Sequence, residues 1–254
     1  AVGAGTKAGG PNYLVGLSDW EDAPRVSSAS LPDDAAGRLA TRVASALGGD
    51  AAAWLLGATG GDAKDVAQFV GARDASRLGV AINALRYRPV PVTVRAAGSE
   101  ALDAAQATRV IAAGLRAHAA TGTGAGTGAA VSVTLSAPLA FSADVVRLLS
   151  EAGATVVLED DAAWSARARA AAQAGPSEVE RLRLVGQDTA SAVTATYAAT
   201  QGRPDVAVYS QPVTGAARVE MLPFLREQAV SMTAHRFGTV NDLPERALGK
   251  IELV

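Results

Sequence analysis

The pattern of hydrophobic and polar residues changes from one period to another within residues 221–238. Apolar residues in the first half recur every three or four positions, which predicts a short helix. In the second half they alternate with polar residues, as in a half-buried strand. We therefore predict a helix that runs directly into a strand. The apolar residues of the helical half are Leu222, Leu225 and Ala229, and those of the alternating half are Val230, Met232 and Ala234.

Residues 99–209 alternate between helical periodicity and short apolar runs. Strands separated by helices are typical of a parallel sheet with right-handed crossovers. We predict an α/β fold, a Rossmann-like three-layer sandwich with a mostly parallel sheet. The predicted helices cover 99–119, 142–152, 162–174 and 191–200, and the predicted strands cover 130–135, 155–159, 181–185 and 206–209.

Helical patterns also precede this unit. An aspartate before a helix can cap it, because the carboxylate accepts hydrogen bonds from free backbone N–H groups of the first turn. Glycine pairs, which favour helix ends and turns, separate the segments. The predicted helices cover 35–47, 51–56 and 62–70, with Asp33 or Asp34 capping the first and Asp50 the second.

Residues 84–95 have the pattern of extended structure, but Pro89 and Pro91 interrupt it. Proline has no backbone N–H, so two prolines this close favour an edge strand or a projecting arm over a central strand. We predict that 84–95 forms a β-flap that leaves the domain and contacts a neighbour. Tyr87, Pro89 and Pro91 are the flap residues expected at this contact.

Both ends of the chain are predicted to lie outside the α/β domain. Residues 1–17 begin with a glycine-rich stretch that lacks an initial methionine, which suggests a piece of a longer polypeptide. Residues 18–32 have the acidic, serine- and proline-containing composition of a linker. The domain is then expected to cover 33–238, followed by a C-terminal tail over 239–254.

Composition excludes several classes of function. Hydrophobic residues make up 49% of the chain and charged residues 19%, which suits a packed core. A net charge of −2 and a pI of about 5.8 give no reason to expect nucleic acid as a partner. No apolar run has the length of a membrane span, and a cytoplasmic location is expected. The absence of cysteine excludes disulfides, thiolate metal sites and a cysteine nucleophile within this chain.

Three stretches were considered for nucleotide binding. The glycine-rich residues 121–128 follow a predicted helix and precede a strand, the reverse of a dinucleotide-binding turn, so a flexible loop is favoured. The turn of the first predicted βαβ unit, residues 136–142, contains no glycine. Acids at 159–161 could bind a ribose, or Asp160 or Asp161 could cap the next helix, which is the favoured interpretation. We therefore predict no cofactor site.

The histidines provide no clear catalytic site. His118 and His235 are far apart in sequence, which argues against a histidine metal site. His235 lies beside Arg236 and Phe237, but no nucleophile or carboxylate motif accompanies it. A general base is conceivable there, and a structural or interface histidine is favoured. We predict no catalytic residue and no metal ligand.

Three stretches resemble the bacterial proline utilization A family: residues 5–14, 85–95 and 225–238. The first is similar to the end of that family's glutamate-semialdehyde dehydrogenase module. The other two are similar to the flap and terminal motif of an added C-terminal domain, a degenerate relative of the aldehyde dehydrogenase fold. The resemblance implies a parent enzyme that oxidises proline to glutamate with FAD and NAD. It also implies that the catalytic cysteine and the NAD-binding turn lie before Ala1.

The resemblance implies a non-catalytic structural and lid domain that packs on the upstream aldehyde dehydrogenase module and helps to retain the intermediate. An independent NAD-binding domain and an oligomerisation module remain as alternatives, and a homo-oligomer is compatible with each. The parent could associate peripherally with the inner membrane. The residues expected at the docking surface, besides the three flap residues named above, are Arg226, Glu227, His235, Arg236 and Phe237.

Overall fold

A computed structural model describes residues 31, 33–78, 80–121, 133–174, 181–186, 189–233, 235–236, 239–240 and 242–253. Within these ranges the main body contains a parallel sheet of five strands in the order β5-β4-β3-β6-β7. The order runs outward in both directions from β3, as in a doubly wound fold. The strands are β3 (Val92–Ala96), β4 (Val133–Ala137), β5 (Thr155–Leu158), β6 (Arg181–Val185) and β7 (Ala207–Tyr209).

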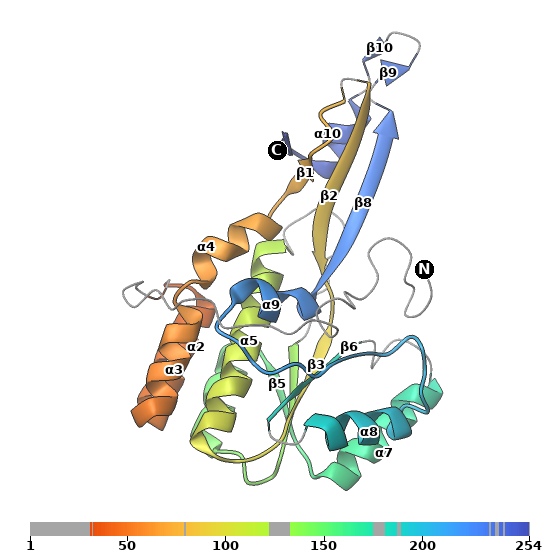
Figure 1. Ribbon diagram of the computed structural model, residues 1–254. Coiled ribbons are helices and arrows are strands. Elements are labelled where there is room, and N and C mark those ends of the chain that lie inside the picture. Colours follow the sequence, from red (N-terminus) through yellow and green to blue (C-terminus); the bar gives the residue numbers. More distant parts are fainter. Residues whose placement is uncertain are drawn as a thin grey trace.

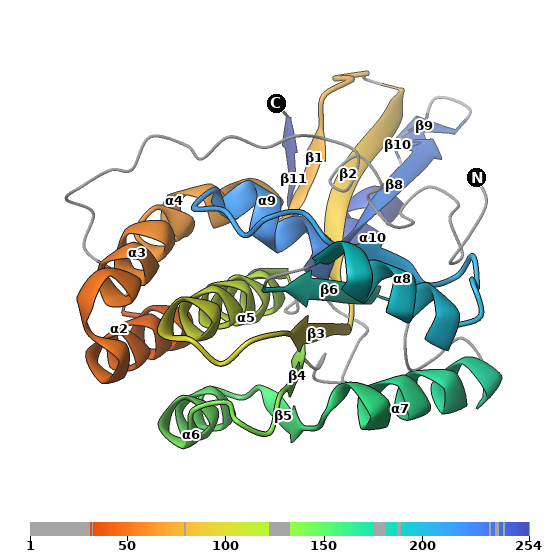
Figure 2. The ribbon, with the colours of Figure 1, turned by 60° about the horizontal axis from the view of Figure 1, so that its bottom comes forward.

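Helices cover both faces of this sheet. Figure 2 shows α5 and α6 on one side and α7 and α8 on the other. The arrangement confirms the predicted Rossmann-like three-layer α/β sandwich. The helix and strand bounds in this unit lie within three residues of the prediction. The helices are α5 (Ala101–Thr121), α6 (Ala143–Glu151), α7 (Asp161–Ala174) and α8 (Thr189–Ala199).

A helical layer precedes the sheet and packs on α5. Its first helix, α2 (Ala35–Leu47), begins and ends where the sequence predicted. Asp34 is its cap, since its carboxylate accepts a hydrogen bond of 2.6 Å from the backbone N–H of Gly37. Gly48, and not Asp50, is the cap residue of the next helix. The other elements of this layer are α3 (Gly49–Thr59), α4 (Asp62–Val66) and the 3₁₀ turn η1 (Ala67–Phe69).

A second sheet forms a flap that projects from the body (Figure 1). Its strands follow the order β11-β1-β2-β8. The two long strands, β2 and β8, pair antiparallel over nine positions, from Ala81↔Thr233 to Pro89↔Leu225. The elements of the flap are β1 (Ala72–Asp74), β2 (Ala81–Pro89), β8 (Leu225–Thr233), β9 (His235–Arg236), β10 (Thr239–Val240), α10 (Leu243–Leu248) and β11 (Ile251–Leu253).

The bounds predicted for the flap were wrong at its C-terminal end. Residues Val92–Ala96 form the central strand of the parallel sheet, between β4 and β6, and all five are buried. Pro89 ends β2, and Pro91 lies in the two-residue connection to β3. The missing N–H groups therefore fall where the chain leaves one sheet and enters the other. The prolines mark a junction between sheets.

The helix predicted over Leu222–Ala229 was also wrong in its second half. Helix α9 (Ala217–Met221) continues as a 3₁₀ turn, η2 (Leu222–Phe224), and the strand already begins at Leu225. Pairing with β2 supplies the backbone hydrogen bonds of this stretch, and it outweighs the helical spacing of the apolar residues. Beyond residue 239, the predicted tail contributes α10 and β11, and β11 pairs parallel with β1.

A buried ionic cluster fastens α5 to the helical layer. The carboxylate of Asp62 lies 2.7 Å from Arg109 and 2.8 Å from Arg116, and all three side chains are almost fully buried. Arg116 also binds Asp34 at 2.8 Å, next to the start of α2. Removing one partner from such a cluster leaves a charge without compensation, which costs several kcal/mol. The cluster therefore fixes the register of α2, α4 and α5.

We found no helix among the described residues with the length and apolarity needed to cross a bilayer.

Gly114 in α5 provides a test of the packing between this helix and the foot of the flap. A Cβ at this position would overlap the ring of Phe224, which is fully buried. A Gly→Ala change inside a helix normally stabilises by about 1 kcal/mol. We expect the opposite sign for Gly114→Ala, a loss of roughly 1–3 kcal/mol from overpacking, measured by urea unfolding.

Gly61→Ala is the matched control, because a Cβ there meets open space and the backbone angle φ is −81°. Its effect should stay within about 0.5 kcal/mol. A Gly114→Ala variant more stable than the parent would contradict the packing described here.

Candidate functional site

The two long flap strands leave the body at one point, which we call the flap root. The backbone N–H of Val90, just after β2, donates to the carbonyl of Phe224, just before β8, at 3.0 Å. The Nε2 atom of His118 lies 2.9 Å from the Val90 carbonyl oxygen. Its ring meets that of Phe224 edge to face, with centroids 5.9 Å apart. His118 therefore has a structural place at the flap root.

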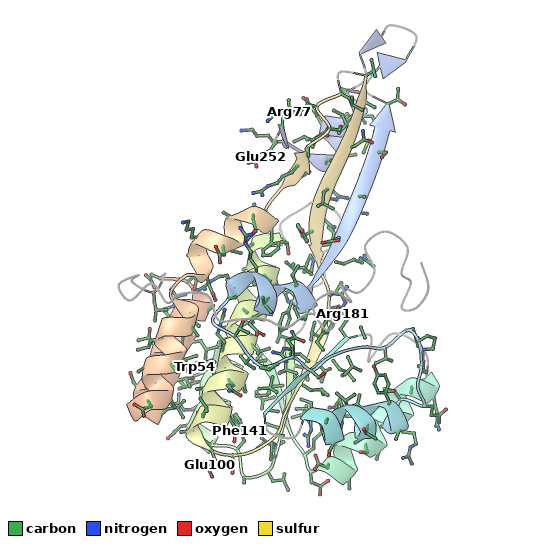
Figure 3. The ribbon with its side chains drawn as sticks, in the orientation of Figure 1. Trp54, Arg77, Glu100, Phe141, Arg181 and Glu252 are labelled. Carbon is green, nitrogen blue, oxygen red and sulfur yellow. The ribbon has the colours of Figure 1, made fainter. Side chains whose placement is uncertain are left out.

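Arg181, at the amino end of β6, holds the other side of the flap root. Its Nη1 donates to the carbonyl of Pro223 at 2.8 Å and to that of Leu225 at 2.6 Å. The side chain is buried between the parallel sheet and the foot of β8 (Figure 3). One guanidinium thus fixes the point at which β8 starts.

Arg183 lies two residues further along β6, so it shares a face with Arg181. It forms a fully buried ion pair with Glu220 of α9 at 3.1 Å. It also donates to the carbonyl of Gln211 at 2.7 Å. Glu220 in turn accepts from the backbone N–H of Thr214 at 2.8 Å. Together the two arginines tie the chain that connects β7 with β8 to the sheet.

Tyr87 and Glu227, both predicted at the docking surface, face each other across the β2–β8 ladder. The Tyr87 hydroxyl donates to Glu227 over 3.4 Å, and its ring packs edge to face on Phe69, 4.9 Å away. Burial, and then the nearby Glu227 carboxylate, raises the pKa of Tyr87. Both side chains are half-buried, so part of their surface contacts other residues of this chain and is not exposed to a docking partner.

Arg226 lies directly opposite Arg88, at the body end of the ladder. Directly opposite residues of antiparallel strands share a face, and like charges there repel each other. Within the residues that the structure describes, neither guanidinium has an ion-pair partner. Arg86, on the same face, donates to Gln228 at 2.6 Å, and burial and then Arg88 lower the pKa of its guanidinium.

The structure describes the other predicted docking residues only in part. Pro89 pairs with Leu225 at the foot of the ladder, and Pro91 is exposed. His235 and Arg236 form β9, which pairs with β10 at the far end of the flap. Phe237 lies outside the described residues. The described residues predicted to dock therefore belong to two parts of the flap, its root and its tip.

Strand β8 is an edge strand of the flap sheet. Within the described ranges it has β2 on one side and no strand on the other. Its nine residues leave a row of backbone groups along the outer side. Such an edge can accept a strand from another segment or chain.

The carboxyl end of the parallel sheet, where folds of this type bind nucleotides, lies at the opposite end of β3 from the flap. The first strand of the sheet is β3, so the predicted first turn, residues 136–142, is in fact the second. The error follows from assigning 92–95 to the flap. The first turn contains Gly98 with a φ of +81°, and a Cβ there would overlap the Asp103 carboxylate. Asp103 accepts from the backbone N–H of Glu100 at 3.1 Å, so a carboxylate of the chain occupies the start of α5.

The acids at 159–161 also have partners within the chain. Asp160 caps α7 by accepting from the N–H of Ala163 at 2.7 Å, as the favoured interpretation predicted. Asp161 pairs with Arg95 at 2.7 Å. Glu159 accepts from Ser136 at 2.5 Å, so all three acids take part in internal contacts.

Trp164 joins this cluster on the side of α7. The guanidinium carbons of Arg95 and Arg167 lie 5.6 Å and 5.1 Å from its ring centroid. Arg167 also binds Glu159 at 2.5 Å. Burial raises the pKa of the Glu159 carboxyl, but the hydrogen bonds from Arg167 and Ser136 outweigh it, and the net pKa is lowered. A pocket of about 260 Å³ lies beside Arg95 and Trp164.

The glycine-rich residues 122–128 lie outside the described residues. Among the residues that are described, no group of three His, Cys, Asp or Glu side chains could hold a metal ion.

Sequence reasoning did not find the buried arginines, although one signal was present. Residues 181–185 read Arg-Leu-Arg-Leu-Val, which places two arginines on the same face of a strand predicted in the middle of a sheet. Burial requires partners for both guanidinium groups, and these include backbone carbonyls and the Glu220 carboxylate, 28–44 residues away in sequence.

Comparison with known proteins supports the fold. No family model matches the chain, and no curated protein matches it. Proline Utilization A (PutA) from Corynebacterium freiburgense is similar in structure, with a TM-score of 0.53 and 24% identity. The match covers 94% of this chain and 18% of that protein. This chain has the fold of a segment of PutA.

A putative aldehyde dehydrogenase from Burkholderia cenocepacia also matches, at 18% identity and a TM-score of 0.40. That match covers 69% of this chain and 39% of the other. The chain thus spans less than a fifth of the PutA protein and less than half of this aldehyde dehydrogenase.

Arg181→Met tests the flap root. The methionine retains most of the volume but leaves two buried carbonyls without their charged donor, so we expect a loss of roughly 3 kcal/mol of stability. Hydrogen exchange at Val90, whose N–H closes the root, should accelerate more than exchange in α2, which serves as the internal control. Equal acceleration in both places would show that Arg181 has no specific role at the root.

Glu159→Gln tests the acid cluster. Because the folded-state pKa of Glu159 is lowered, its stabilisation is present above the ordinary value of 4.5 and disappears as the pH falls through the folded-state pKa. At pH 7 we expect Glu159→Gln to cost about 2 kcal/mol, and the difference from the parent should vanish in acid. Unfolding by urea at several pH values measures this.

Glu151→Gln, at an exposed ion pair with Arg42 and Arg147, is the control, and at pH 7 it should change the stability much less than Glu159→Gln does. A Glu159→Gln deficit that persists unchanged at low pH would refute the assignment.

Proposed function

We propose that this chain is a non-catalytic structural and lid domain of a proline-catabolising enzyme related to PutA. It docks through its flap on an upstream aldehyde dehydrogenase module. There it supports the NAD-dependent oxidation of glutamate semialdehyde and helps to retain that intermediate. The observation that carries the proposal is the flap itself: a nine-residue ladder, anchored at its root, with two facing arginines and an outer edge that no described strand covers.

The facing arginines indicate the chemistry of the partner. Two like charges directly opposite on a strand pair destabilise the ladder in isolation. Carboxylates from a neighbouring surface would neutralise Arg88 and Arg226, and charge-assisted hydrogen bonds to guanidinium groups are stronger than neutral ones. We therefore expect Asp or Glu side chains on the docking partner at the flap root.

The edge of β8 adds main-chain recognition. A strand laid against it would gain backbone hydrogen bonds, while the alternating side chains set the register. The cavity closed by such contacts would keep a reactive aldehyde from diffusing away. This role needs a stiff arm, and the anchoring of both flap strands by Val90, Phe224 and Arg181 supplies it.

We assign the catalytic chemistry of the parent enzyme to other parts of the longer polypeptide. Aldehyde dehydrogenases resembling this family use a cysteine nucleophile, and the 254 residues contain none. NAD and FAD would likewise bind elsewhere. The carboxylate of Asp103 supports this for NAD, because a negative charge at the start of α5 repels a pyrophosphate.

Charge reversal of the facing arginines tests the proposal in the longer polypeptide that contains the upstream modules. Arg88→Glu with Arg226→Glu retains the core residue Phe224, whereas deletion of 221–238 would remove it. We expect coupled turnover of proline to glutamate to fall about tenfold or more, equivalent to roughly 1.4 kcal/mol of docking energy. Proline dehydrogenation alone should stay within about twofold, since the flap docks on the other module.

Arg169→Glu, at an exposed position on α7, is the matched control and should leave both rates unchanged. Unchanged coupled turnover in the double variant would refute the docking role. A halved particle mass in sedimentation with normal coupling would favour the oligomerisation module. Saturable NAD binding by the 254-residue chain would favour the nucleotide-binding alternative.

A further inference from the structure

Three arginines share one face of the flap ladder near the body of the protein. Residues two apart on a strand point to the same side, so Arg86 and Arg88 of β2 lie on one face. Arg226 of β8 is directly opposite Arg88, and Gln228 is directly opposite Arg86. Directly opposite residues of antiparallel strands share a face. These four residues, which we call the arginine cluster, therefore occupy the corners of one rectangle on the ladder (Figure 1).

The arginines of this cluster have no negative partner among the described residues. Arg88 and Arg226 form no ion pair there. Arg86 donates only to neutral oxygens, at 2.6 Å to the side chain of Gln228 and at 3.5 Å to the carbonyl of Ala247. Burial and then Arg88 lower the pKa of the Arg86 guanidinium, since each disfavours its charged form.

Acids on the same strands and on the neighbouring elements do not supply this partner. Glu227 lies on the other face of β8. Asp74 of β1 is fully buried and binds Ser76. At the start of α10, Asp242 pairs with Arg246. Glu245 of the same helix is exposed, where solvent and salt screen its charge. The cluster therefore suits a ligand that brings its own negative charge.

The spacing of the cluster selects the class of that ligand. Its corners lie about 7 Å apart along a strand and about 5 Å apart across the ladder. Guanidinium groups donate to phosphate oxygens over about 2.7–2.9 Å and often do so in bidentate pairs. One tetrahedral oxoanion can therefore accept from several corners at once. The amide nitrogen of Gln228 adds a neutral donor, because its oxygen already accepts from Arg86.

We propose that the arginine cluster binds a dianionic tetrahedral oxoanion, with phosphate as the simplest case. Arg88 and Arg226 bind it from opposite strands, and Arg86, oriented by Gln228, contributes the third guanidinium. The dianion removes the repulsion between the facing arginines, so binding stabilises the ladder. One consequence rests on the proposed docking function: bound phosphate occupies the arginines that would meet the partner's carboxylates, and it weakens docking.

Titration of the full 254-residue protein with sodium phosphate at about pH 8, where phosphate is mainly a dianion, tests the site. NMR shifts of the β2 and β8 amides should saturate with a dissociation constant on the order of 1 mM. Sodium chloride at the same ionic strength is the control for screening and should give no saturable change. Phosphate at about ten times its dissociation constant should raise the melting temperature by about 3–6 °C.

Arg88→Gln combined with Arg226→Gln should weaken phosphate binding by about tenfold or more. Without phosphate, the melting temperature of this double variant should rise by about 1–3 °C, because the repulsion across the ladder is gone. The rise separates loss of binding from loss of folding. Arg169→Gln, at an exposed position on α7, is the matched control and should bind phosphate as the parent does.

Methyl phosphate has the same terminal oxygens and distinguishes two sources of the ligand. Tighter binding of phosphate identifies a free oxoanion, equal binding identifies a phosphate ester, and both results support the site. The proposal is overturned by an absence of saturable phosphate binding to about 20 mM, by equal shifts with sodium chloride, or by unaltered binding in the double variant. Docking is tested separately by coupled turnover of the longer polypeptide, so either proposal can fail alone.

Discussion

The buried arginines of β6 are the constraint on which the rest of the structure depends. Arg181 and Arg183 donate to backbone carbonyls of the chain between β7 and β8, and Arg183 also pairs with Glu220. A buried guanidinium is costly unless its donors are satisfied, so these carbonyls cannot move far from their positions. The flap strand β8 starts where Arg181 holds it. The orientation of the flap relative to the body is therefore a consequence of side chains inside the sheet.

The amino and carboxyl ends of the parallel sheet therefore differ in the contacts that their charged residues make. At the amino end of β6 the arginines hold the flap, in whose ladder Arg88 and Arg226 lie opposite each other, without an ion-pair partner among the described residues. At the carboxyl end the charged groups largely pair with each other. Asp103 occupies the start of α5, and Glu159 binds both Arg167 and Ser136. The facing arginines of the β2–β8 ladder therefore lie at the opposite end of the sheet from the crevice in which folds of this type bind nucleotides.

The prediction succeeded where the signal was local and failed where two sheets compete for the same segment. Asp34 caps α2 through an N–H three residues away, so sequence alone was sufficient for that helix. Val92–Ala96 is extended in both the prediction and the structure, yet it joins the parallel sheet and not the flap. Leu225 begins a strand because β2 pairs with it, despite apolar spacing that suggested a helix. Neither choice can be read from periodicity, because each depends on a partner strand far away in the chain.

The sequence by itself determined the α/β alternation, most element bounds and the lack of cysteine within this chain. These follow from local periodicity and from composition. The tertiary structure decided which strand is first in the sheet, that Pro89 and Pro91 mark a junction between two sheets, and that Arg181 and Arg183 are buried anchors. The partners of these arginines lie 28–44 residues away in sequence, and the energy of burying a polar group is set by such partners.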